Sequence, residues 1–95
     1  MTARVIVVSY RLRLDTCRSL KDKRQILKSM LSRIRQKFNV SAVESGLNDV
    51  PASAWITWSS VSLSNGLLDR TKHAVNRFVE GNFDVEIVEE VSELN

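Results

Sequence analysis

Two kinds of hydrophobic spacing alternate along the chain. In residues 4–14 apolar and polar positions alternate with period two, which is typical of a strand with one buried face. That face would carry Ile6, Val8, Tyr10, Leu12 and Leu14. In residues 19–38 apolar side chains recur every three or four positions, which predicts one amphipathic helix. Its apolar stripe consists of Leu20, Leu27, Leu31, Ile34 and Phe38, flanked by Ile26 and Met30.

The second half of the chain repeats the same two kinds of segment. Asn39 can end the helix, and residues 40–45 predict a short strand. Residues 46–53 contain Gly, Asn, Asp and Pro and predict a loop, and residues 54–63 predict a long strand. Ser64 can cap a second helix that stops at Gly81 or Asn82. The apolar side of that helix would consist of Leu67, Leu68, Thr71, Ala74, Val75, Phe78 and Val79.

The last strand, over residues 84–91, again alternates with period two. Strict alternation places Val85, Ile87 and Val91 on one face and Glu86, Val88 and Glu90 on the other. The predicted order is therefore β-α-β-β-α-β in a single domain over residues 1–95.

This order predicts an α+β fold, a two-layer sandwich of the ferredoxin-like kind. Right-handed crossovers give an antiparallel sheet in strand order 4-1-3-2, with both helices on one face and the other face open. We expect one core between the sheet and the two helices. Its members would include Leu12, Leu27, Leu31, Ile34, Val75 and Phe78.

Composition excludes several classes of function. The 95 residues contain one cysteine and one histidine, so the sequence predicts no disulfide, no metal site and no cofactor. No apolar run approaches the roughly 18 residues of a membrane span, and a cytoplasmic protein is the simplest expectation. Cys17 lies beside Arg18 and could have a lowered pKa, although an incidental cysteine is the alternative. His73 has no catalytic partner in sequence, and we expect no enzyme.

Charge is divided unevenly along the chain. Residues 1–38 hold eleven of the fourteen Lys and Arg and two acids, whereas residues 39–95 hold three basic and nine acidic residues. On the first helix, Lys21, Arg24, Lys28 and Arg35 fall within an arc of roughly 60°. Lys23, Arg33 and Lys37 are predicted on the opposite flank. This pattern favours binding of an anion or a nucleic acid, and a merely solvated face is the alternative.

The start of the first helix is a second candidate for anion binding. Arg18, Ser19, Lys21 and the first free amides of the helix could together hold a phosphate group. Ordinary capping by Ser19, with Asp22 three residues later, explains the same residues. The chain has no Gly-rich phosphate loop, so nothing supports nucleotide hydrolysis.

The open sheet face offers a weaker RNA site at Arg11 and Arg13. Pairing of these arginines with Glu86 and Glu90 of the last strand is the favoured alternative. Trp55 and Trp58 have opposite parity, so one of them should be buried and the other exposed on this face. A half-apolar open face could equally hold a second copy of the chain in a homodimer.

The segment SLKDKR, Ser19–Arg24, resembles the signature of the bacterial YlxP-like family of unknown function. The likeness includes the pattern LRL at Leu12–Leu14 and extends through Phe38–Ser41, Glu44 and the Ser64-Asn65 pair. The resemblance implies a ferredoxin-like fold and no established enzymatic activity. Members of that family are often encoded beside transcription and translation factors, which implies work with RNA or the ribosome by association only.

These observations lead to two hypotheses of function. The first is a non-enzymatic RNA-binding or ribosome-associated factor that uses the basic face of the first helix. The alternative is a homodimeric protein-interaction module that assembles through its open sheet face. An enzyme acting on an anionic small molecule has the least support, because no base or nucleophile is positioned for it.

Overall fold

The structure is a computed structural model that describes residues 2–95. Its elements follow the predicted order β-α-β-β-α-β. They are β1 (Arg4–Arg13), α1 (Leu20–Lys37), β2 (Ser41–Gly46), β3 (Ser53–Ser62), α2 (Asn65–Asn82) and β4 (Glu86–Leu94). Neither helix is long and apolar enough to cross a membrane.

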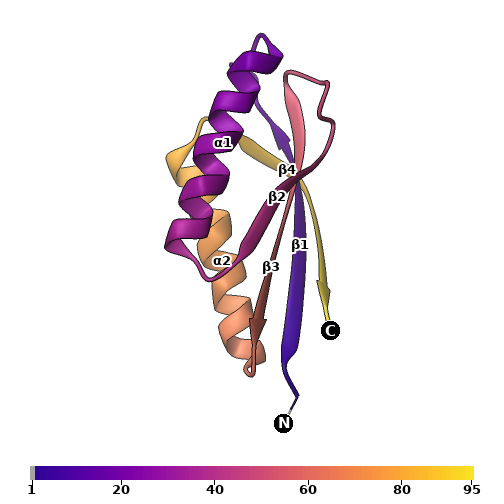
Figure 1. Cartoon of the computed structure of the whole chain (residues 1–95), viewed down its shortest axis with the longest axis vertical. Helices are drawn as coiled ribbons and strands as arrows, with labels where there is room; N and C mark the ends of the chain where they lie inside the picture. Colours follow the sequence, from indigo (N-terminus) through magenta and orange to yellow (C-terminus); the bar gives the residue numbers. More distant parts are fainter. Residues whose placement is uncertain (1) are drawn as a thin grey trace.

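The four strands form one antiparallel sheet in the order β2-β3-β1-β4. Both helices lie on one side of this sheet, and the opposite side carries no element of the described chain (Figure 1). The predicted ferredoxin-like sandwich is therefore confirmed, including the 4-1-3-2 strand order. The β2–β3 connection and the start of α1 lie together at one end of the molecule (Figure 1).

A single core lies between the sheet and the helices. All six residues predicted for it are buried, with exposed fractions of 8% or less. The even-numbered side chains of β1 from Ile6 to Leu12 are buried as predicted and belong to this core. On β3, Trp58 is buried and Trp55 lies half-buried on the other face.

β4 departs from strict alternation because its register with β1 shifts by one residue. Arg11 pairs with Glu89, whereas the next residue of β1, Leu12, pairs with Ile87. Val88 is therefore an extra residue, and the irregularity is a β-bulge. Every position after Val88 faces the side opposite to the one that strict alternation predicts.

Two predicted faces are wrong as a result of the bulge. Val91 does not share the face of Ile87 and is 48% exposed. Glu90 lies opposite Tyr10 and so faces the helices rather than the open side of the sheet. Because of the bulge, Glu89 and not Glu90 is the neighbour of Arg11 on the open face.

Leu67 was also expected on the apolar side of α2, but half of its surface is exposed. It lies on the flank of the helix, in one row with the half-buried Thr71 and Ala74. The first turn of α2 lies at the end of the molecule away from α1, so no second helix covers that flank (Figure 1). Leu68, the next residue, is buried instead.

Candidate nucleic-acid interface

α1 begins with a side-chain cap. The hydroxyl of Ser19 accepts a hydrogen bond from the amide of Asp22 at 3.1 Å, and the carboxylate of Asp22 accepts one from the amide of Arg18 at 3.3 Å. Ordinary capping, one of the two predicted roles, is therefore present. A phosphate held by Arg18, Ser19 and Lys21 would share the site with the Asp22 carboxylate, and that role stays a prediction.

A row of basic side chains follows along α1. We call Lys21, Arg24, Lys28 and Arg35 the basic row; all four are exposed. None of them takes part in an ion pair within the described residues 2–95. From Lys21 to Arg35 the row is about 21 Å long, at the helical rise of about 1.5 Å per residue. It therefore presents uncompensated positive charge over several turns of α1.

Arg35 differs from the other members of the row because it also contacts the sheet. Its Nε and Nη2 atoms donate to the carbonyl oxygen of Ala42 at 3.0 and 2.6 Å. Ala42 belongs to β2, which is an edge strand, so the basic row lies on the side of α1 that faces this edge. The contact fixes the orientation of the guanidinium and ties α1 to β2.

Lys23 was expected on the opposite, exposed flank of α1, and this expectation is wrong. The side chain is fully buried. Its position fits the spacing of the buried residues Leu27, Met30 and Ile34, which follow at steps of four, three and four. That spacing was available in the sequence, but the charge of the side chain obscured it.

The buried ammonium of Lys23 holds the connection between β2 and β3. It donates to the carbonyl oxygens of Leu47 at 2.6 Å and Ser53 at 3.2 Å, and it lies 3.5 Å from a carboxylate oxygen of Glu44. Leu47 has a positive φ of 58°, a backbone angle that residues other than glycine seldom adopt. Lys23 is thus a positioning residue for the loop beside the start of α1, and it is a feature that sequence reasoning missed.

On the flank of α1 that faces α2, two further cations lie against aromatic rings. The guanidinium carbon of Arg33 lies 5.3 Å from the ring centre of Phe78 and 5.0 Å from that of Phe83. The Nζ atom of Lys37 lies 5.2 Å from the ring centre of Phe78. Such contacts stabilise by about 0.5–1 kcal/mol at exposed sites. Both cations are exposed as predicted, and the rings fix where their charges lie.

The arginines on the open sheet face have carboxylate partners. Arg11 pairs with Glu89 at 3.3 Å, and Arg13 pairs with Glu86 and, at 3.2 Å, with Asp15. Internal pairing was the favoured prediction for this face, and it is confirmed for Glu86. For Glu90 it is wrong, because the bulge at β4 brings Glu89 to this face instead.

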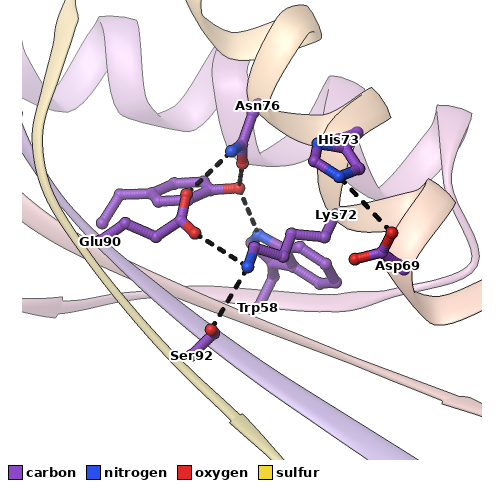
Figure 2. Close-up of polar contacts among 8 residues, drawn as sticks. Trp58, Asp69, Lys72, His73, Asn76, Glu90 and Ser92 are labelled. Carbon is purple, nitrogen blue, oxygen red and sulfur yellow. Dashed lines mark hydrogen bonds and ion pairs between the residues drawn. The ribbon is translucent and has the colours of Figure 1, made fainter. Parts of the chain in front are cut away.

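Glu90 joins a polar cluster beneath α2. Its carboxylate accepts a hydrogen bond from the Asn76 amide at 2.8 Å and pairs with Lys72 at 3.2 Å (Figure 2). Asn76 also accepts a hydrogen bond from the phenol of Tyr10, and that phenol accepts one from the Trp58 indole at 3.1 Å. Burial raises the pKa of Tyr10 above its ordinary value. This cluster gives hydrogen-bond partners to the buried side chains of Tyr10 and Trp58.

Comparison with protein families gives a match that covers most of the chain. The model of a family described as "Protein of unknown function (DUF503)" matches residues 5–91. The chain belongs to the DUF503 family. A search of curated proteins found no match to it.

In this DUF503 protein, charge is segregated by structural layer. The two helices contain ten basic and three acidic residues. The four strands contain three basic and five acidic residues. The net positive charge therefore lies on the helices, chiefly on α1, whereas the strands have a small net negative charge.

Two further residues were considered for reactive chemistry. Cys17 is buried, and burial raises the pKa of its thiol, so of its two interpretations the lowered pKa is wrong. His73 is exposed and lies 3.5 Å from Asp69, one helical turn earlier. Within residues 2–95, no three His, Cys, Asp or Glu side chains are placed to hold a metal ion.

Proposed function

We propose that this protein is a non-enzymatic, cytoplasmic RNA-binding or ribosome-associated factor of the YlxP-like kind, which contacts phosphates through the basic row of α1. One observation carries the proposal. In the described chain the basic row has no carboxylate partner, whereas Glu86, Glu89 and Glu90 pair with side chains outside α1. Phosphate contact requires only positive charge within reach, and this row supplies it over several helical turns.

The contrast with the sheet face supports the choice of α1. Arg11 and Arg13 are paired with carboxylates, so a phosphate would have to displace those partners. Nucleic-acid binders that use an open sheet stack bases on exposed aromatic side chains. On this face Trp55 is only half-exposed, and its ring covers Gly46. The sheet arginines are therefore the weaker candidates.

Two variants that remove the same net charge test the proposal. Arg24→Gln/Lys28→Gln removes two members of the basic row, and Arg11→Gln/Arg13→Gln removes the two paired arginines. Binding of a mixed-sequence RNA hairpin is measured by fluorescence anisotropy at several salt concentrations. We expect the first variant to reduce the salt slope by about two, since each lost phosphate contact removes roughly one. The second variant should change the slope little; equal slopes for the parent and both variants would refute the proposal.

The second candidate is a homodimer formed through the open sheet face. The favouring observation is that valines are exposed on this face and that its arginines are internally paired. The exposed apolar members include Val43 on β2, Val61 on β3 and Val91 on β4. Sedimentation of the parent and of Val61→Asp at increasing concentration tests it, and a parent that stays monomeric would exclude it.

A further inference from the structure

The solvent-facing side of α1 is uncharged along most of its length. Gln25, Ser29, Ser32 and Gln36 follow at steps of four, three and four, so they form one stripe opposite the buried side of the helix. We call these four residues the neutral crest. Gln25, Ser29 and Gln36 are exposed and Ser32 is half-buried. Each side chain can donate and accept hydrogen bonds without carrying charge.

Fixed positive charges lie on both sides of the neutral crest. The basic row lies along the β2 side, where Arg35 is held by the Ala42 carbonyl. On the α2 side, Arg33 and Lys37 are held against the rings of Phe78 and Phe83. A helix with its side chains is about 10–12 Å across. The two flanks can therefore reach two separate lines of phosphates, with the crest between them.

This surface lacks what single-stranded ligands require. Proteins that bind single strands combine a basic groove with aromatic side chains on which the bases stack. α1 contains no aromatic residue. Of the two rings beside its cations, Phe78 is buried and Phe83 is half-buried, and the guanidinium of Arg33 lies against both. Trp55 lies on the opposite side of the molecule. A duplex needs no such platform, because its bases are already stacked.

The position of α1 in the fold also limits the kind of groove. α1 lies in one layer with α2, and β2 lies on its other side, so the helix cannot enter a deep, narrow groove (Figure 1). The minor groove of A-form RNA is wide and shallow and displays 2′-hydroxyl groups, which neutral Ser and Gln side chains can contact. Its two strands place phosphates on either side.

We propose that α1 binds double-stranded RNA, with the neutral crest lying in the minor groove and the two basic flanks contacting the phosphates of the two strands. The inference rests on the proposed function, since both use the basic row, and it adds the form of the ligand. Recognition in this mode depends on helical shape and on 2′-hydroxyls rather than on base sequence.

The test compares three probes of one mixed sequence: an RNA duplex of about 16 base pairs, one of its strands alone, and the matching DNA duplex. Affinities are measured by fluorescence anisotropy at one salt concentration. We expect the RNA duplex to bind about tenfold more tightly than the single strand, because two lines of phosphates are contacted instead of one. The DNA duplex should bind more weakly than the RNA duplex, because it lacks the 2′-hydroxyls.

A substitution at the crest separates shape from charge. Ser29→Trp adds bulk without altering charge, so it should weaken duplex binding about tenfold. The indole ring that this substitution adds offers a stacking surface, so single-strand binding should be unchanged or stronger. Asn65→Trp, at the exposed start of α2, is the matched control and should change neither affinity.

Four results would overturn the inference. Equal or tighter binding of the single strand would refute the duplex mode and leave the proposed function intact. Tighter binding of the DNA duplex, or a Ser29→Trp variant that binds the RNA duplex like the parent, would refute contact in the RNA minor groove. Absence of salt-dependent binding to all three probes would refute the proposed function as well.

Discussion

Substitution of the buried Lys23 should lower the stability of the protein substantially. Its ammonium is buried and donates to two backbone carbonyls of the β2–β3 connection, close to the Glu44 carboxylate. Lys23→Met retains most of the aliphatic volume and removes only the charged donor. The variant therefore isolates the polar contribution of this side chain from its packing.

The magnitude follows from the contacts that are lost. Hydrogen bonds from a charged donor contribute about 1.5–3 kcal/mol each, so two of them contribute about 3–6 kcal/mol. Two effects reduce this figure: the Leu47 carbonyl keeps a hydrogen bond from the Val50 amide, and a buried ammonium is itself costly to desolvate. We expect a net loss of about 2–4 kcal/mol in the free energy of unfolding, a large share of the ~5–15 kcal/mol of a typical domain.

Urea unfolding followed by circular dichroism measures this loss. Lys21→Met is the matched control, because Lys21 is exposed and lies two residues earlier on the same helix. Its unfolding free energy should remain within about 0.5 kcal/mol of the parent. If Lys23→Met unfolds at the same urea concentration as Lys21→Met, the buried ammonium does not stabilise the loop and the reasoning is wrong.

Two further predictions concern the core. Leu31→Ala should reduce the free energy of unfolding by about 2–5 kcal/mol, because Leu31 is 7% exposed in the core; a melting curve like that of the parent would contradict this. Because the buried Tyr10 has a raised pKa, the unfolded chain ionises first as pH rises above the ordinary value of 10.0. Stability should be fully present below that pH and fall above it. Tyr10→Phe should flatten the fall of stability at high pH. It also leaves the Trp58 indole without its acceptor, which should cost about 1–3 kcal/mol of stability. An unchanged pH profile of stability would exclude Tyr10 as the cause.

Much of the fold could be predicted because one face of each element meets the core. The period-two pattern of β1 assigned Leu12 and the other even-numbered residues to the buried face. The helical period of α1 assigned Leu27, Leu31 and Ile34 to the core. These positions follow from local geometry alone, since burial of one stripe or one face determines the orientation of the element.

The errors arose where tertiary contacts override local pattern. The bulge at Val88 inserts one residue into β4, and no turn residue or glycine marks it in the sequence. Lys23 shares the spacing of the buried residues but carries a charge, so its burial depends on carbonyl groups that only the folded β2–β3 connection provides. The basic row could be identified in advance, but the attachment of Arg35 to β2 could not.

The difference in charge between the two layers gives the molecule an electric dipole, which favours one orientation in an electric field. The helical layer is the positive pole and the sheet, with its excess of glutamates, is the negative pole. Near a polyanion such a molecule experiences a torque as well as an attraction. On approach to such a surface, the torque favours orientations with the helices toward it and the open sheet face outward. The exposed valines of that face would then stay accessible to a second molecule.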